Sequence, residues 1–274
     1  MQKITCDAAY FNPKDVLECG QIFRFSPYKE GYKVFSGDKA AYVHTDGKTT
    51  VIECADGDYF YNFFDLGRDY AAIIGKLEEF GIPALTRAVN LSKGLRLLNQ
   101  DAEETIFSFI ISQNNNIPRI KKIIESICAE LGEEREFSGE TYHSFPSALK
   151  IAERPPEFFR ALGAGYRDEF LVKTAERISS EGLEHLKALP VAELRKALLT
   201  YHGIGPKVAD CVTLFGFGRG KSFPVDTWVE KIYREDFGGT LKDRNKISSY
   251  FTSLFGEYSG LVQQYLFYAK RAHL

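Results

Sequence analysis

The feature that most constrains the fold is a change in the spacing of apolar residues near Asp101. Before this position, short segments rich in aromatic and β-branched residues alternate with turn sequences such as Asp46-Gly47; they lie at 22–25, 32–35, 40–44 and 49–53. Asp-Gly between two such segments is typical of a type I′ hairpin turn, in which both central residues have a positive φ. We therefore predict an antiparallel sheet, followed by helix over 59–80.

From Asp101 onward, apolar residues recur every three or four positions, which is the period of an amphipathic helix. Asp101 and Glu104 have the spacing of a capping box, while Pro118 and Gly132 mark the start and the end of the next helix. Further helices are predicted over 155–163, 168–181, 190–201, 206–216, 226–236, 243–255 and 258–272. The fold class is α+β, with an N-terminal antiparallel β-rich domain at 1–98 and helical domains at 99–274.

Composition excludes several classes of protein. No apolar segment approaches the roughly 20 residues that span a bilayer, and the N-terminus lacks the layout of a secretory signal. We therefore expect a cytoplasmic protein with no membrane partner. The five cysteines include no Cys-x-x-Cys pair, which argues against a disulfide scaffold and a zinc site. No metal and no cofactor are expected.

The most informative stretch is VAELRKALLTYHGIGPKVADCVTLFGFG, residues 191–218. One helix ends near Tyr201, Gly203 and Gly205 permit a tight reversal, and Pro206 suits the first position of the next helix. The free amides of such a helix start can bind a phosphate oxygen. An ordinary helical turn is the alternative, but the complete pattern favours a DNA-binding helix–hairpin–helix.

Lys207 occupies the second position of that helix. The positive end of the helix dipole disfavours an ammonium there, which favours a neutral and nucleophilic amine. A solvated surface lysine is the alternative. Cys211 lies one turn later and is a candidate for the same pocket, although a buried small residue is the simpler interpretation.

The segment SFPVDTW, residues 222–228, supplies a carboxylate shortly after the hairpin. Asp226 is a candidate N-cap for the helix that follows. Thr227 is the competing cap, because it would form a capping box with Glu230 and leave Asp226 free. In both cases a carboxylate lies at a helix N-terminus.

Together these motifs resemble the helix–hairpin–helix DNA glycosylase superfamily and, within it, the 8-oxoguanine DNA glycosylases. The likeness extends over nearly the whole chain and is carried by ECGQIFRF (18–25), SQNNNIPRI (112–120), LGAGYR (162–167), the hairpin, PVD and QQYLF (263–267). It implies an enzyme that flips 8-oxoguanine out of double-stranded DNA, removes it and cleaves the strand. Some relatives hold an iron–sulfur cluster on four cysteines near the C-terminus, but only Cys211 lies beyond Cys128 here. That cluster is excluded.

The resemblance implies a role for each matching residue. Lys207 matches the lysine that attacks the anomeric carbon and forms a Schiff base, and Asp226 matches the aspartate that stabilises positive charge on the sugar. Gly20 matches the glycine whose carbonyl accepts the extra ring N–H of oxidised guanine. Gln263 and Phe267 match residues that bond to the Watson–Crick edge and stack on the base; four positions apart, they share a helix face.

Other matching residues contact the DNA around the flipped base. Those that fill the gap or hold the orphaned cytosine are Asn114, Arg119, Tyr166 and Arg167. Arginine carries only donors, so a pair of arginines suits the acceptors of cytosine. Trp228 departs from the pattern, because many members have a histidine there that is thought to hold a phosphate; an indole N–H can still donate. A monomer is expected.

Two alternatives remain at this point. Alkylation glycosylases of the same superfamily also combine a β-rich domain with the hairpin, but they usually lack a lysine at position 207. A non-catalytic DNA-binding module would use the hairpin only to hold phosphates. The net charge of −2 counts against any DNA binder, because phosphate neutralisation supplies most of the non-specific affinity. DNA binding therefore requires positive groups on one face, or many backbone amide contacts.

Overall fold

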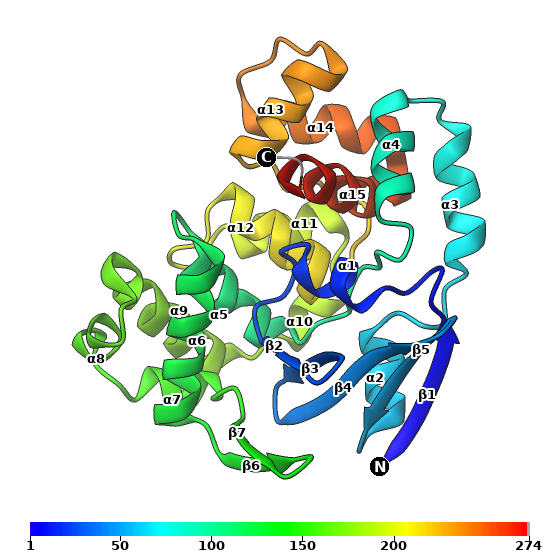
Figure 1. Cartoon of the computed structure of the whole chain (residues 1–274). Coiled ribbons are helices and arrows are strands. Elements are labelled where there is room, and N and C mark those ends of the chain that lie inside the picture. The colour runs from blue at the N-terminus through cyan, green and yellow to red at the C-terminus, as the bar shows by residue number, and fades with distance from the viewer. Residues whose placement is uncertain (273–274) are drawn as a thin grey trace.

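The computed structural model describes residues 1–272. An antiparallel sheet forms the N-terminal part, and the chain that follows is largely helical (Figure 1), so the predicted α+β fold is confirmed. The sheet has five strands in the order β1-β5-β4-β3-β2. Their bounds are β1 Gln2–Asp7, β2 Phe25–Tyr28, β3 Gly31–Ser36, β4 Lys39–Asp46 and β5 Thr49–Cys54.

The hairpin predicted from Asp46-Gly47 is present, but its turn type differs. Asp46 pairs with Thr49, so the two central turn residues are Gly47 and Lys48. Gly47 has a φ of +60°, whereas Lys48 is not among the residues with a positive φ. Glycine at the first central position is the pattern of a type II′ turn. The prediction of type I′ was therefore wrong, because the aspartate belongs to the strand.

The segment 22–25 forms a strand only from Phe25 onward. Ile22 belongs to the core of the sheet and Phe23 to the core of the helices. A strand covered on one face would alternate buried and exposed side chains, whereas here consecutive side chains are buried in two different cores. The segment is therefore an ordered link between them. The sequence pattern also missed β1, an edge strand that pairs with β5.

Most buried apolar side chains belong to two hydrophobic cores, and a small third cluster joins Ala40 and Tyr42 of the sheet to Phe137. The smaller core lies against the sheet and includes residues of α1 and α2, such as Leu17 and Phe60. The larger core joins the later helices and also α3 and α4; α4 lies beside α15, and α3 packs against α4 (Figure 1). Leu85 of α4, for example, is buried in this larger core. The division of the chain at 98/99 stays a prediction.

The helices follow the predicted ranges closely after Asp101. Their bounds are α1 Pro13–Glu18, α2 Gly57–Phe63, α3 Tyr70–Glu79, α4 Pro83–Leu91, α5 Ala102–Ser112, α6 Ile117–Leu131, α7 Ala148–Ala152, α8 Pro156–Ala161, α9 Asp168–Glu181, α10 Glu184–Lys187, α11 Val191–Leu198, α12 Pro206–Cys211, α13 Thr227–Phe237, α14 Arg244–Phe255 and α15 Ser259–Ala272. The segment predicted as one helix over 59–80 forms two helices: α2 ends at Phe63, and α3 begins after its N-cap Asp69. Four helices (α1, α4, α7 and α10) and the hairpin β6 Glu134–Phe137 with β7 Glu140–His143 were not predicted.

The helix predicted over 206–216 is continuous but changes its geometry. α12 ends at Cys211 and a π-helical turn follows over Val212–Gly216. Within residues 1–272, no helix is both long and apolar enough to cross a membrane.

Candidate active site

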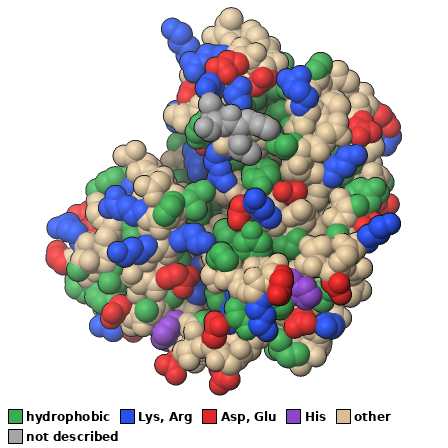
Figure 2. Space-filling view, in the orientation of Figure 1, with side chains coloured by type: hydrophobic (Ala, Val, Ile, Leu, Met, Phe, Trp, Pro, Cys, Tyr) green, Lys and Arg blue, Asp and Glu red, His purple; other side chains and the backbone are tan. Residues whose placement is uncertain are grey.

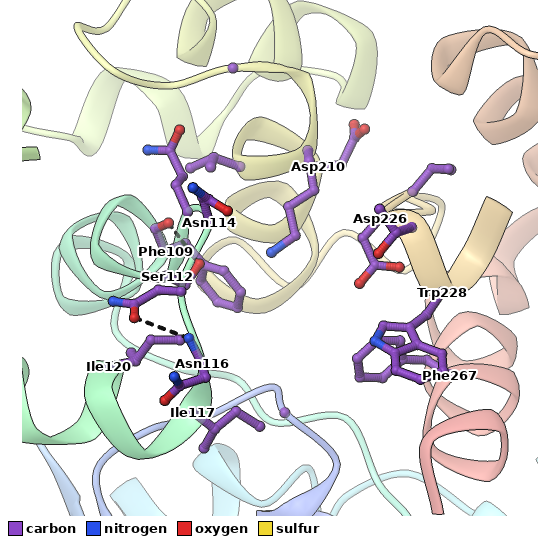
Figure 3. A pocket seen from close by; sticks show the side chains of 18 of the residues that line it. Phe109, Ser112, Asn114, Asn116, Ile117, Ile120, Asp210, Asp226, Trp228 and Phe267 are labelled. Atoms are coloured by element: carbon purple, nitrogen blue, oxygen red, sulfur yellow. Dashed lines mark hydrogen bonds between the residues drawn. The ribbon is translucent and has the colours of Figure 1, made fainter. Parts of the chain in front are cut away.

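A cavity of about 950 Å³ opens between the α5–α6 turn, the start of α12, the start of α13 and the last part of α15. Segments from all parts of the chain contribute to its wall, from Gly20 to Arg271. Figure 3 shows Phe109 and Asn114 on one side of this cavity and Asp226, Trp228 and Phe267 on the other. The cavity therefore brings together residues that the sequence motifs singled out separately.

The hairpin between α11 and α12 forms one edge of the site. Gly203 has a φ of +78°, and a Cβ at this position would lie 2.4 Å from Cγ of Phe170. Only glycine fits this position without displacing the phenylalanine. Gly205 is the N-cap of α12 and makes no side-chain cap bond, which leaves the amides at this helix start available. Gln113 Nε2 donates to the Gly203 carbonyl at 2.9 Å and joins the hairpin to the α5–α6 turn.

Lys207 lines the cavity from the first turn of α12. Its Nζ lies 4.9 Å from the centroid of the Phe109 ring, which belongs to α5. Cys211, one turn later, is buried in the larger core and is not among the residues that line the cavity. Burial raises the pKa of its thiol to about 11, against the opposing effect of the Lys207 charge. The thiol therefore keeps its proton at neutral pH, and of these two residues only Lys207 lines the cavity.

Asp226 is the N-cap of α13 and also lines the cavity. Its Oδ1 accepts the backbone N–H of Val229 at 2.9 Å. The alternative capping box of Thr227 does not form. Glu230 instead accepts from Nη2 of Arg244 at 2.9 Å, which holds its carboxylate away from the helix start.

Gly20 and Phe267 lie next to each other in the cavity wall. A Cβ on Gly20 would lie 3.4 Å from Cε1 of Phe267, and the glycine has a φ of +90°. Gln263 is on the same helix but is 4 % exposed and does not line the cavity. Its Oε1 accepts from Nε2 of Gln264 at 2.7 Å. The structure thus brings Gly20 and Phe267 together and leaves the Gln263 side chain behind the wall.

The turn that contains Asn114 meets the turn that contains Tyr166. Asn114 lines the cavity with a φ of +47°, and Tyr166 is exposed. Arg119 is exposed and donates from Nη2 to the Gly163 carbonyl at 3.1 Å. Arg167 is buried, and its guanidinium donates to the carbonyls of Gln113, Asn114 and Ala164. The two predicted cytosine-binding arginines are therefore in different environments, one available and one committed to the backbone.

Several residues of the site were not found from the sequence. Phe109 of α5 carries the ring beneath Lys207, yet within a helix of mostly apolar residues it has no distinguishing signal. Arg244 and Arg271 line the cavity as well, and the helical spacing of Arg271 from Phe267 was the signal that could have found it. Figure 2 shows Lys and Arg side chains bordering the hollow between the helices at the left and those at the top. Within the described residues, no group of three metal-ligating side chains is arranged to hold an ion.

Two family models together match residues 3–256. The first, 8-oxoguanine DNA glycosylase, N-terminal domain, matches residues 3–106. The second, HhH-GPD superfamily base excision DNA repair protein, matches residues 107–256. The chain belongs to the 8-oxoguanine DNA glycosylase family. The resemblance inferred from the sequence motifs is confirmed.

Individual relatives of this glycosylase agree with that assignment. The 8-oxoguanine glycosylase/lyase of Clostridium acetobutylicum, solved with double-stranded DNA containing cytosine opposite 8-oxoG, is 36% identical with a TM-score of 0.91; 96% of this chain and 93% of that chain are covered. The N-glycosylase/DNA lyase of Saccharomyces cerevisiae is 30% identical over 256 residues, 81% of this chain and 67% of the relative. The probable N-glycosylase/DNA lyase of Methanothermobacter thermautotrophicus is 32% identical over 233 residues, 77% of this chain and 74% of the relative. The protein is a bifunctional repair enzyme that removes 8-oxoguanine from DNA and also acts as a DNA lyase.

Proposed function

We propose that this enzyme removes 8-oxoguanine opposite cytosine, with Lys207 as the nucleophile and Asp226 as the electrostatic partner of the sugar. The observation that carries the proposal is the shared cavity. An amine at the start of α12 and a carboxylate at the start of α13 line the same space, and Lys207 is the one lysine among its lining residues in the described chain. A target base inside the duplex cannot be attacked, so the base must enter this cavity by flipping.

The chemistry needs one bond to break and one to form at the same carbon. The neutral amine of Lys207 attacks C1′ as the bond from C1′ to N9 breaks, and the departing base takes a proton. Positive charge develops on the sugar, and the fixed carboxylate of Asp226 stabilises it. Opening of the sugar ring breaks the bond from C1′ to O4′, O4′ takes up a proton, and an iminium forms between C1′ and Nζ. Loss of a C2′ proton then expels the 3′ phosphate and cleaves the strand.

The cavity walls suggest how the base is held. Phe267 offers a ring on which a base can stack, and the carbonyl of Gly20 is the proposed acceptor for the N7–H that guanine lacks. Gln263 is proposed to read the Watson–Crick edge, which requires its carboxamide to leave Gln264. Asn114 and Tyr166 are proposed to fill the gap in the duplex. Arg119 is proposed to contact the orphaned cytosine. We infer that the enzyme acts as a monomer.

The hairpin and Trp228 are proposed to hold the strand. The amides around Gly203 and Gly205 supply donors for a phosphate, and the indole N–H of Trp228 supplies another at the mouth of the cavity. Backbone amides add affinity without adding formal charge. This accounts for DNA binding by a chain whose net charge is −2.

Borohydride trapping tests the proposal. A borohydride reductant converts a transient iminium into a stable secondary amine, so the wild-type enzyme should become covalently linked to a duplex with 8-oxoguanine opposite cytosine. It should not become linked to the undamaged duplex. A monofunctional glycosylase would release the base without a covalent adduct. A DNA-binding module would neither release the base nor form an adduct. Either result would contradict the proposed chemistry.

A further inference from the structure

A guanidinium lies on the cavity wall beside Gly20. Arg271, in the last turn of α15, lines the cavity, and its Nη2 donates to the backbone carbonyl of Glu18. A Cβ built on Gly20 would lie 3.0 Å from Nη1 of this arginine. The bond to Glu18 fixes the side chain along the segment that leads into the glycine. The cation and the glycine are therefore neighbours on one wall.

Among the described residues, most of the donors of Arg271 have no hydrogen-bond partner. A guanidinium carries five N–H donors. In residues 1–272, the bond to Glu18 is the only hydrogen bond that this guanidinium makes, and no carboxylate forms an ion pair with it. Its central carbon lies 5.5 Å from the centroid of the Phe267 ring. The donors thus lie next to the ring on which the proposed function stacks the base.

The base itself presents a matching edge. In 8-oxoguanine, the N7–H donor lies between two carbonyl acceptors, O6 and O8. A protein surface complementary to this edge needs an acceptor with a donor beside it. The Gly20 carbonyl is the proposed acceptor, and a guanidinium has donors but no acceptor. Because both groups lie on the same wall, one base edge can engage them together.

We propose that Arg271 is a base-binding residue that donates a hydrogen bond to a carbonyl oxygen flanking N7 of the flipped 8-oxoguanine. This inference rests on the proposed function, which places the base against Gly20 and Phe267. The competing role for an arginine at a DNA-binding cavity is a phosphate contact. That role would contribute equally whether or not a base is present.

A binding comparison separates the two roles. The Lys207→Gln variant, which cannot form the iminium, is titrated with two duplexes that differ at a single nucleotide opposite cytosine. One carries 8-oxoguanine and the other carries the base-free tetrahydrofuran analogue. Adding Arg271→Met should weaken binding to the 8-oxoguanine duplex about tenfold, the scale of one base contact, and leave binding to the analogue within about twofold. Fluorescence anisotropy at one salt concentration gives both dissociation constants.

Two further variants control the experiment. Arg271→Lys keeps the charge but not the planar fork, so it should restore only part of the affinity for 8-oxoguanine; full restoration on both duplexes would indicate a phosphate contact. Arg87→Met removes the same charge from an exposed position on α4 and should change neither affinity. Arg271→Gln replaces the methionine variant if the latter does not fold.

The inference is overturned if Arg271→Met weakens binding to both duplexes equally, or to neither. The proposed function fails in a different way, through the absence of a trapped adduct with the wild-type enzyme. Because the binding comparison uses intact DNA and needs no chemistry, the two failures are distinguishable.

Discussion

The Asp226 carboxylate combines two tasks at one residue. One oxygen accepts the N–H of Val229, and the residue also lines the cavity that contains Lys207. In the proposed mechanism, the helix start holds this carboxylate in place as charge develops on the sugar, which is the advantage of a preorganised site. The sequence did not decide whether Asp226 or Thr227 is the N-cap of α13, because both residue types fit the local pattern. Local spacing could not show that Glu230 pairs with Arg244 of a neighbouring helix. This pairing is why Glu230 does not form a capping box with Thr227.

Two substitutions at Asp226 separate these tasks. Asparagine is as good an N-cap as aspartate, so Asp226→Asn should unfold at the same urea concentration as the wild type. Its single-turnover excision should fall by about 10²–10³, the scale of one lost electrostatic group at a reacting centre. Asp226→Ala loses the cap as well and should be less stable by about 1 kcal/mol. Parental excision by Asp226→Asn would contradict the catalytic role, and equal stability of both variants would contradict the cap.

At the scale of elements, the two turns at 113–116 and 163–167 meet through Arg167. Its guanidinium satisfies three backbone carbonyls, so it holds the turns in place. Arg119 makes one bond across the same junction and keeps its other donors exposed. The sequence could not distinguish the two arginines, because their chemistry is identical. They differ in their places in the fold: Arg167 lies in the turn that packs against residues 113–114, whereas Arg119 lies in the exposed first turn of α6.

Substitution by methionine should therefore affect the two arginines differently. Arg119→Met should keep its stability but lose the preference for cytosine as the opposite base, since a guanidinium suits the acceptors of cytosine better than the donor of adenine. Arg167→Met leaves buried carbonyls without partners, which costs about 1–3 kcal/mol. Cleavage of duplexes with each of the four opposite bases, together with thermal unfolding, measures both effects. An unchanged ranking of opposite bases in Arg119→Met would refute its cytosine contact.

In α15, helical spacing predicted only part of what the structure shows. The interval of four residues correctly predicted that Gln263 and Phe267 would share a helix. It did not predict that Gln263 would be buried and bonded to Gln264, because packing of α15 against α4 and α13 decides which part of its face reaches the cavity. Arg271, four residues beyond Phe267, extends that face to the cavity edge. The spacing rule thus identified the face but not its boundary.

In the molecule as a whole, two buried ionisable residues, Glu104 and Arg24, join the sheet to the helices. Glu104 of α5 accepts the backbone N–H of Gly37 at 2.6 Å, in the β3–β4 turn. Arg24 donates to Glu125 of α6 at 3.0 Å and to the carbonyl of His143 at 2.6 Å. The sequence pattern placed Glu104 in a local capping box with Asp101. Only half of that box forms, because the glutamate turns to a partner 67 residues away.

This junction should make stability depend on pH. Burial raises the pKa of Glu104 to about 7, opposed by the charge of Arg24. Between the ordinary value of 4.5 and about 7, the folded state therefore holds a proton that the unfolded state has released. The stabilisation is complete below about pH 4.5 and is lost as the pH rises through about 7.

Glu104→Gln should remove this dependence, because the amide stays neutral at every pH. The free energy of unfolding of the wild type, taken relative to that of Glu104→Gln, should fall as the pH rises from 4.5 to 7 and then level off. Urea unfolding of both proteins across this range measures it. A difference that rises with pH would show that the carboxylate, rather than the acid, is the form favoured by the fold.

The position of the trapped adduct shows whether Lys207 is the nucleophile. The wild-type enzyme is linked to 8-oxoguanine DNA with borohydride, digested, and the modified peptide is sequenced by mass spectrometry. We expect the reduced sugar on Nζ of Lys207, and no adduct with Lys207→Gln, since a neutral amide cannot form an iminium. An adduct on another amine, such as Lys221 or the N-terminus, or undiminished trapping by Lys207→Gln, would contradict it.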